Sequence, residues 1–223
     1  MTVKSLLARA GLALAMALPL APTFVPSDAI AKPAVAAKLT DQDRADLQRI
    51  EKYLNDIRTL SSPFLQVAAD GGQSKGTVLI ARPGKIRIDY EPPTSLLVVG
   101  SGGSMAVYDR DLKQVNYVNI NQSPIGVLVR EQIRLAGDVT VTRFERGSTV
   151  LRVTLASTVD ADAGRVTLTF DDKPLQLRQW VVFDPQGTET RVSLLDPKLG
   201  VPIDSKIFDF KAPDRGATTG GSN

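Results

Sequence analysis

The stretch ARPGKIRIDYEPP, residues 81–93, determines how the rest of the sequence is interpreted. Apolar side chains at positions 86, 88 and 90 alternate with charged side chains at 87, 89 and 91, a period of two that predicts a half-buried strand. Pro83-Gly84 predicts a turn that joins this strand to the preceding apolar run, residues 77–81. The stretch therefore predicts an antiparallel hairpin with one apolar face.

The place of Arg82 depends on the register of this hairpin. A two-residue loop would mix apolar and charged side chains on one face, whereas a three-residue loop, residues 83–85, keeps the apolar side chains together. We therefore expect the three-residue loop, which pairs Arg82 with Ile86, Ile80 with Ile88 and Val78 with Tyr90. In this register Arg82 lies at the rim of the apolar face.

An arginine on an apolar face must either reach water or find hydrogen-bond acceptors. In one interpretation, Arg82 belongs to the turn and its guanidinium group reaches solvent. In the other, its donors bind backbone carbonyl groups of a mobile element that covers the apolar face. The nearest candidates for that element are the ends of two segments with helical patterns.

The first of these segments begins with Thr40 and Asp43, which form a variant of the capping box at the start of a helix. Ser61-Ser62-Pro63 predicts its end, and charged side chains such as Asp46 are expected on its outer side. Spacings of three and four residues place one apolar stripe on the helix, made of Leu47, Ile50, Leu54 and Ile57.

The second segment, residues 123–137, is apolar nearly all round its early part and is also predicted to be helical. Its apolar residues include Ile125, Leu128 and Val129. Two interpretations of both segments stay open: ordinary packed core, or the inner face of a lid.

Short strands separated by turn residues fill the rest of the chain. They are predicted at residues 64–68, 77–81, 85–91, 94–100, 104–109, 114–120, 139–145, 149–157, 165–171, 175–184, 188–196 and 207–210. Such short connections imply antiparallel neighbours. We therefore predict a mainly β fold with an α lid, in which about eleven strands form a strongly curved antiparallel sheet, or incomplete barrel, covered by helices.

The beginning of the chain has the pattern of a secretory signal peptide, residues 1–31. Lys4 and Arg9 precede an apolar run at 11–25, and Ala29-Ile30-Ala31 supplies a cleavage pattern. We expect a linker at 32–39, one domain at 40–215, a disordered tail at 216–223, and a periplasmic location.

Composition excludes several classes of function. The chain has no cysteine and no histidine, which removes histidine-dependent triads and the usual zinc sites. It has 27 basic and 24 acidic residues, so no polybasic footprint points to nucleic acid. Asp160, Asp162 and Gly164 have the wrong spacing for a calcium loop and predict a hairpin turn. We expect no cofactor, no metal and no enzymatic activity.

A set of short motifs, in this order and spacing, resembles the periplasmic outer-membrane lipoprotein carrier family, LolA. The motifs are Phe64-Leu65-Gln66, Gly76, Arg82-Pro83-Gly84-Lys85-Ile86-Arg87, Tyr90, Pro92-Pro93, Leu97-Val98-Val99, Gly102-Gly103, Val107-Tyr108-Asp109, Gln114-Val115, Ser123-Pro124-Ile125 and Phe208-Asp209-Phe210-Lys211-Ala212-Pro213. Where that family has aromatic residues, this chain has Ile86, Ile88 and Ala106.

The resemblance implies a carrier whose apolar hollow holds the acyl chains of lipoproteins, with Arg82 controlling closure of the lid. It implies loading by an ATP-driven inner-membrane complex and unloading to an outer-membrane lipoprotein receptor, and we expect a monomer. The cavity residues would be Val78, Ile80, Ile86, Ile88 and Tyr90, and the lid face would be Leu47, Ile50, Leu54, Ile57, Ile125, Leu128 and Val129. The alternative function is a periplasmic module that senses lipid or lipoprotein and regulates a membrane partner.

Overall fold

The computed structural model describes residues 34–160 and 163–211. The chain divides into two units, Met1–Ile30 and Ala31–Asn223, and every described residue belongs to the second. The predicted signal peptide, residues 1–31, and the predicted tail, residues 216–223, lie outside the described residues. Residues 34–40, which include the described part of the predicted linker, form no helix or strand.

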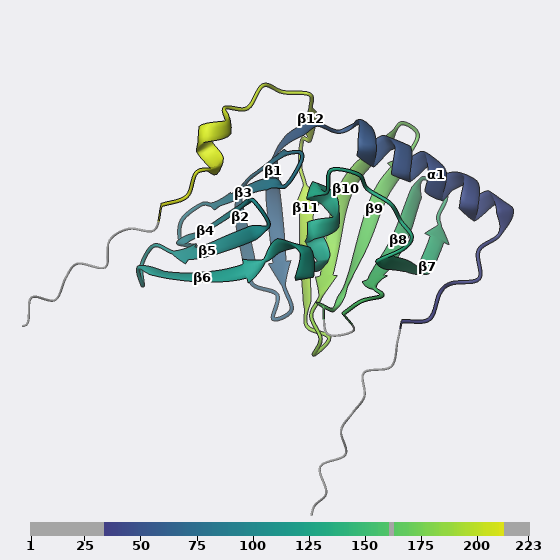
Figure 1. The fold of residues 1–223 in the computed structure, drawn as a ribbon, viewed down its shortest axis with the longest axis horizontal. Helices are drawn as coiled ribbons and strands as arrows, with labels where there is room; N and C mark the ends of the chain where they lie inside the picture. The colour runs from purple at the N-terminus through teal and green to yellow at the C-terminus, as the bar shows by residue number, and fades with distance from the viewer. Residues whose placement is uncertain (1–33, 161–162, 212–223) are drawn as a thin grey trace, which may run out of the picture. The chain divides into compact units, whose positions relative to one another are not determined.

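A twelve-stranded antiparallel sheet forms most of the second unit (Figure 1). The strands are β1 (Thr59–Ala68), β2 (Gln73–Ala81), β3 (Lys85–Tyr90), β4 (Leu96–Ser101), β5 (Ser104–Asp109), β6 (Gln114–Asn119), β7 (Val139–Arg146), β8 (Val150–Ser157), β9 (Arg165–Asp172), β10 (Leu175–Phe183), β11 (Glu189–Leu194) and β12 (Lys198–Leu199). Their order is β6-β5-β4-β3-β2-β1-β11-β10-β9-β8-β7, with β12 paired to β1. The sheet curves but does not close between β6 and β7, which confirms the predicted incomplete barrel.

The hairpin of β2 and β3 has the predicted apolar face but a different register. Ile80 pairs with Ile86 and Val78 with Ile88, so the loop consists of residues 82–84 and the predicted pairing was wrong by two residues. Gly84 explains the difference, because its φ of +73° suits the last position of a three-residue hairpin loop. A shift of two residues preserves the face of every side chain, so the apolar set stays together.

Helix α1 (Asp41–Asp56) begins as the sequence predicts, with Thr40 and Asp43 forming a complete capping box. It ends earlier than predicted, because Ile57 is already extended and Ser61-Ser62-Pro63 belongs to β1. The expectation that Asp46 lies on the outer side was also wrong. Asp46 precedes Ile50 by four residues and is therefore on the buried stripe, where none of its surface is exposed.

The predicted second helix is only partly helical. Two short 3-10 helices, η1 (Ile120–Gln122) and η2 (Pro124–Val129), follow β6, and residues 130–138 form neither helix nor strand. The backbone groups of this irregular part bond to side chains instead of to one another. The N–H of Ile133 donates to Asn55, and the carbonyl of Arg130 accepts from Arg82.

The predicted strand at 207–210 is also absent, and a short 3-10 helix, η4 (Ser205–Phe208), stands there. The side chain of Asp204 caps it by accepting from the N–H of Lys206. Phe208 packs on Leu97 and Val99 in a separate small apolar cluster. In the pairing of β4 with β3, Leu97 lies opposite Asp89 and Val99 lies opposite Arg87. These partners are charged residues of β3, so the cluster lies on the outer face of the sheet.

The main apolar core lies between the inner face of the sheet and the elements that cover it. Trp180 is part of this core and is almost fully buried. Among the described residues, no helix is both long and apolar enough to cross a membrane.

Candidate functional site: the lid and the interior beneath it

Helix α1 and the chain after β6 together cover the interior of the curved sheet, and we call α1, η2 and residues 130–135 the lid. All seven residues predicted for the lid face belong to the main core or pack against it. All five residues predicted for the cavity do the same, with Val78, Ile80 and Ile86 almost fully buried and Ile88 and Tyr90 half-buried. The structure thus brings the two predicted sets together.

In this structure the lid's own side chains fill the part of the interior beneath the end of α1, whereas a hollow of about 240 Å³ lies between η2 and β8–β9, lined among others by Val127, Leu155 and Val166. A void of about 10 Å³ remains between the lid and the sheet. It is lined by Leu54, Ile57, Leu60, Ile80, Leu128, Ile133 and Leu177. A void of this size holds at most about one water molecule. A hydrocarbon guest could reach this part of the interior only if the lid moved.

Arg82 holds both pieces of the lid. Its guanidinium group donates to the carbonyl oxygens of Leu54 at 2.5 Å and Ile57 at 3.0 Å, at the end of α1. It also donates to the carbonyl oxygens of Arg130 at 2.7 Å and Glu131 at 3.0 Å, in the irregular part of the lid. The last carbonyl groups of a helix have no partner within the helix, so Arg82 supplies partners at the end of α1.

The guanidinium group of Arg82 is buried without a carboxylate partner. Only 9% of the residue's surface is exposed, and its fifth bond goes to the amide oxygen of Asn55 at 3.2 Å. Burial lowers the pKa of Arg82, and the nearby charge of Arg58 lowers it further. An arginine nevertheless stays protonated in proteins, so a cation lies beneath the lid with only neutral acceptors.

The backbone of the β2–β3 turn reinforces this arrangement. The N–H of Arg82 donates to the carbonyl of Arg58 at 2.8 Å, directly after α1. The N–H of Gly84 donates to the carbonyl of Val129 at 2.6 Å, at the end of η2. One turn of the sheet therefore contacts both pieces of the lid through backbone and side chain.

The two pieces of the lid also bond directly to each other. The side-chain amide of Asn55 donates to the carbonyl of Ile133 at 2.8 Å and accepts from the N–H of Ile133 at 2.9 Å. A carboxylate oxygen of Glu51 accepts from the N–H of Leu135 at 2.9 Å.

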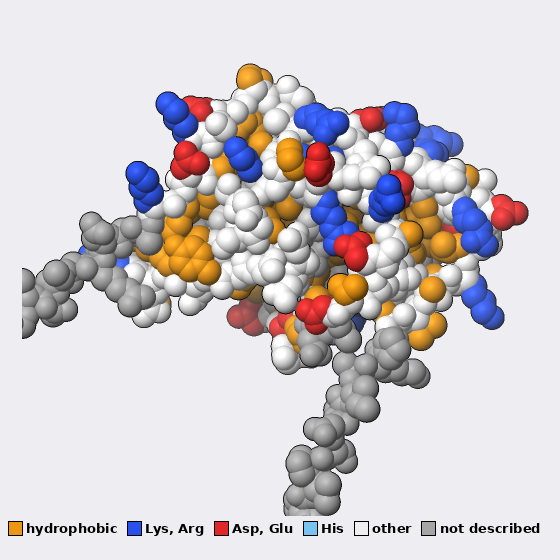
Figure 2. Space-filling model, in the orientation of Figure 1, with side chains coloured by type: hydrophobic (Ala, Val, Ile, Leu, Met, Phe, Trp, Pro, Cys, Tyr) orange, Lys and Arg blue, Asp and Glu red, His pale blue; other side chains and the backbone are white. Residues whose placement is uncertain are grey.

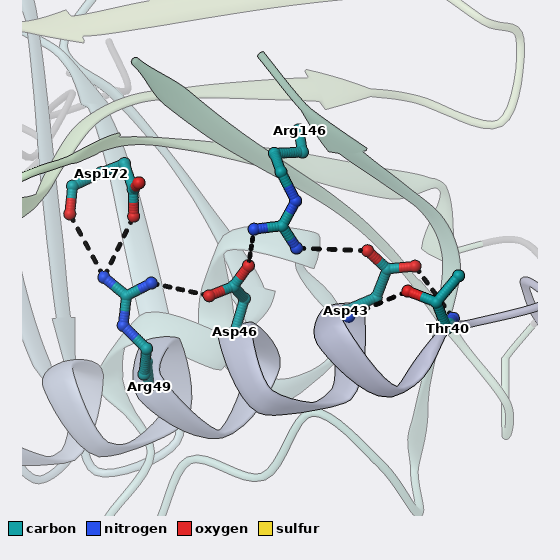
Figure 3. Close-up of polar contacts among 6 residues, drawn as sticks. All are labelled: Thr40, Asp43, Asp46, Arg49, Arg146 and Asp172. Atoms are coloured by element: carbon teal, nitrogen blue, oxygen red, sulfur yellow. Dashed lines mark hydrogen bonds and ion pairs between the residues drawn. The ribbon is translucent and has the colours of Figure 1, made fainter. Parts of the chain in front are cut away.

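The other end of α1 is held to the sheet by a network of charges (Figure 3). Asp46 pairs with Arg49 of the same helix at 2.6 Å and with Arg146 at the end of β7. Arg49 also pairs with Asp172 at the end of β9 at 3.0 Å, and Arg146 contacts Asp43. Since Asp46 is buried and both arginines reach solvent, this network ties the first half of α1 to β7 and β9.

Tyr53 attaches the middle of α1 to the sheet. A register shift lies between Leu177 and Gln179 of β10, and the N–H of Leu177 donates to the Tyr53 hydroxyl at 3.0 Å. The Tyr53 ring also meets Phe170 edge to face, with ring centres 6.1 Å apart. Burial raises the pKa of Tyr53, so the hydroxyl is neutral at physiological pH.

Sequence reasoning identified Arg82 but missed the polar residues of α1 that act with it. Asp46 gave a signal, because a carboxylate four residues before Ile50 falls on the apolar stripe. Glu51 and Asn55 are also four residues apart and flank the stripe. Their hydrogen-bond partners, however, are backbone groups of residues 133 and 135. No residue type in the sequence marks such backbone partners.

The surface over the lid and the sheet carries mixed charges. Figure 2 shows acidic and basic side chains interspersed, with apolar side chains gathered at the side of the sheet where β5 and β6 lie. Exposed apolar residues there are Leu112, Tyr117 and Val118. In the part of the chain that the structure describes, no group of acidic residues could hold a metal ion.

Comparison with known proteins identifies the family. The family model for "Outer membrane lipoprotein carrier protein LolA" matches residues 55–211. The chain belongs to the LolA family. The match starts in the last turn of α1 and includes Arg82, η2 and the whole sheet.

Two relatives and one solved structure illustrate the similarity. An outer-membrane lipoprotein carrier protein from Azotobacter vinelandii is 27% identical over 81% of this chain and 91% of its own length. One from Methylococcus capsulatus is 28% identical over 74% of this chain and 83% of its own length. The crystal structure of a LolA superfamily protein from Nitrosomonas europaea has a TM-score of 0.41 and 14% identity, covering 74% of this chain and 97% of that one.

Proposed function

We propose that this chain is a periplasmic carrier that takes lipoproteins from the inner to the outer membrane with their acyl chains in the interior beneath the lid. The relatives named above are lipoprotein carrier proteins, which supports a carrier role. The observation that favours a lid that opens is Arg82, a buried cation that bonds both lid pieces only through neutral acceptors. Polar bonds of this kind can exchange with water, whereas a continuous apolar seam cannot.

The size of the hydrophobic effect explains why such a carrier is needed. Each CH₂ group buried is worth about 0.8 kcal/mol, so three acyl chains of roughly fifteen CH₂ groups would cost on the order of 36 kcal/mol in water. A lipoprotein therefore cannot cross the periplasm alone. An apolar interior shielded by a lid removes most of this cost.

The same magnitudes indicate which step needs external energy. Passage of acyl chains from a bilayer into the interior exchanges one apolar environment for another. Opening the lid, however, removes Ile50, Leu54, Ile57, Leu128, Val129 and Ile133 from the core, and exposing six such side chains costs about 9–18 kcal/mol. The step that opens the empty lid is therefore uphill, which fits an ATP-driven inner-membrane complex as the loading partner and an outer-membrane lipoprotein receptor as the acceptor.

Arg82 has the role of a latch in this proposal. It closes the lid over the interior in the empty carrier and must release both pieces when acyl chains enter. The carrier acts as a monomer, with no cofactor, and no bond in the lipoprotein is made or broken.

A transfer assay tests the proposal. Proteoliposomes that contain an ATP-driven lipoprotein-releasing complex and a triacylated lipoprotein are mixed with this chain and ATP. We expect the lipoprotein to appear in the soluble fraction bound to the chain, with its acyl chains intact by mass spectrometry. Lipoprotein that stays in the membrane fraction would contradict the carrier role, and cleaved acyl chains would indicate a hydrolase. A non-acylated form of the lipoprotein is the control.

A further inference from the structure

We propose that Asn55 and Glu51 are positioning residues that join α1 to residues 130–135, so that the two pieces of the lid open as one body. This inference rests on the proposed function, because the lid must open for a guest. Release of Arg82 alone would otherwise free two independent pieces, a helix and an irregular strip of chain.

The spacing of the two residues matches the backbone to which they bond. Glu51 and Asn55 are one helical turn apart, about 6 Å along the axis of α1, and lie on the same side of the helix. Ile133 and Leu135 are two residues apart, and two residues of extended chain span about 7 Å. The side chains of the helix therefore meet successive backbone groups, as a neighbouring strand would.

The amide of Asn55 makes the stronger part of this joint. It both donates to and accepts from Ile133, at 2.8 and 2.9 Å, which is the two-bond pattern of a strand pair. It also donates to the carbonyl of Glu51 at 2.9 Å, which fixes its orientation on α1. Its oxygen accepts from Arg82 as well, so Asn55 bonds to Arg82 and to both lid pieces.

Burial below the joint favours movement as one body. Ile133 is 1% exposed and Leu135 is 7% exposed, and Ile133 lines the same residual void as Leu54 of α1 and Ile57 directly after it. The two pieces thus share apolar contacts on the inner side and three hydrogen bonds on the outer side. Besides the bond from the N–H of Leu177 to Tyr53, the bonds that hold them to the sheet at this end come from the β2–β3 turn.

Hydrogen exchange at single amides tests the joint in the lipid-free protein. In Arg82→Leu the lid is released from the turn, and we expect the amides of Ile133 and Leu135 to exchange within about threefold of wild type. Adding Asn55→Ala should speed exchange of the Ile133 amide about tenfold or more, the effect of losing a hydrogen bond. Full deprotection of both amides in Arg82→Leu alone would overturn the inference.

Matched variants separate a joint from a general loss of stability. Glu51→Ala should release the Leu135 amide, and Glu51→Gln should keep it protected, since its amide oxygen still accepts. Lys52→Ala is the control on the exposed side of α1, where Lys52 pairs only with Asp56 within the described residues, and it should change neither amide. The amides of the buried β8 and β9 residues Val153 and Leu168 report global unfolding.

Loading with a synthetic diacylated lipopeptide provides a second readout. Ile133 and Leu135 amides that stay slow in the loaded wild type support one-body opening, and fast exchange at both would overturn it. If the lipopeptide does not bind, the carrier function fails, while the lipid-free comparison still decides whether Asn55 and Glu51 join the lid.

Discussion

At the scale of single residues, two buried ionic side chains hold α1 by different chemistry. Arg82 donates hydrogen bonds to neutral oxygens at the end of the helix. Asp46 lies in the first half of the helix and pairs with two arginines, Arg49 of α1 and Arg146 of β7. The Arg82 bonds can exchange with water when the lid opens. Breaking the Asp46 pairs leaves charges unpaired, so the first half of α1 should stay attached to the sheet.

Replacement of Arg82 should loosen the lid without unfolding the sheet. Arg82→Leu removes all five donated bonds, and a hydrogen bond to a charged group contributes about 1.5–3 kcal/mol, part of which is offset by relief of the buried charge. We expect lid closure to weaken by about 3 kcal/mol. The Arg82→Leu chain should bind acyl groups but deliver them poorly to the receptor in the transfer assay. Normal delivery would contradict the proposed role of Arg82 in closing the lid.

The control for Arg82 is its exposed neighbour. Arg58→Leu also removes one arginine near the end of α1, but Arg58 is exposed and only its backbone carbonyl bonds the turn. Delivery should stay normal in this variant.

Asp46→Ala should destabilise the fold. Loss of one partner of a buried ion pair costs up to about 3–5 kcal/mol, and the value is lower here because Arg49 and Arg146 can turn to solvent. We expect the free energy of unfolding in urea to fall by about 2–3 kcal/mol. Asp41→Ala breaks an exposed pair with Arg44 and should have little effect. Equal effects of the two variants would show that Asp46 does not anchor α1.

At the scale of elements, α1 and η2 are either ordinary core or a plug that a guest displaces. Both interpretations predict buried side chains, so burial alone does not separate them. They differ in the effect of truncation on binding. A smaller plug destabilises the empty protein but makes the open state easier to reach.

Leu54→Ala should therefore change stability and binding in opposite directions. Truncation of a buried leucine costs about 2–5 kcal/mol, and we expect unfolding in urea at correspondingly lower concentration. If about 2 kcal/mol of this loss destabilises the closed lid relative to the open lid, a fluorescent fatty acid, which binds the open state, should bind about thirtyfold more tightly. Leu97→Ala, in the outer cluster, should destabilise without any gain in binding. Unchanged or weaker binding in Leu54→Ala would favour ordinary core.

The start of α1 should be sensitive to acid. Hydrogen bonds from the side chain and then the backbone of Thr40 hold the pKa of Asp43 below its ordinary value, and Arg146 lowers it further. A depressed pKa in the folded state contributes stability above the unfolded pKa of about 3.9, and this contribution is lost as pH falls through the folded value. Urea unfolding between pH 3 and 7 should show wild-type stability falling below about pH 4. Asp43→Asn should reduce that fall, and an identical slope would exclude Asp43 as its cause.

At the scale of the whole molecule, the sequence predicts the strands better than the connections. A strand is predictable because apolar and polar side chains alternate along it. The apolar face of the β2–β3 hairpin was predicted correctly because Ile80, Ile86 and Ile88 follow this alternation. The register failed because the loop conformation is decided by the backbone of Gly84. The second helix failed because residues 130–135 bond to α1 and Arg82, partners that are distant in sequence.

The carrier role makes one prediction for the protein as purified. Chain expressed with residues 1–31, the predicted signal peptide, and isolated from the periplasm of the host should carry extractable acyl material, and mass spectrometry of the extract measures it. Arg82→Leu should retain more of this material than wild type because it delivers poorly. A wild-type extract and an Arg82→Leu extract that are both free of acyl material would count against the proposal.

The neutral partners of Arg82 have a consequence for what can operate the lid. Peptide and amide oxygens do not titrate between about pH 5 and 8, so acidification of the compartment leaves each of these acceptors unchanged. When the guanidinium group withdraws, it leaves no counter-ion facing the hydrocarbon, only oxygens that water can solvate. Within this pH range, occupancy by a guest and not proton concentration would therefore set whether the lid is open or closed.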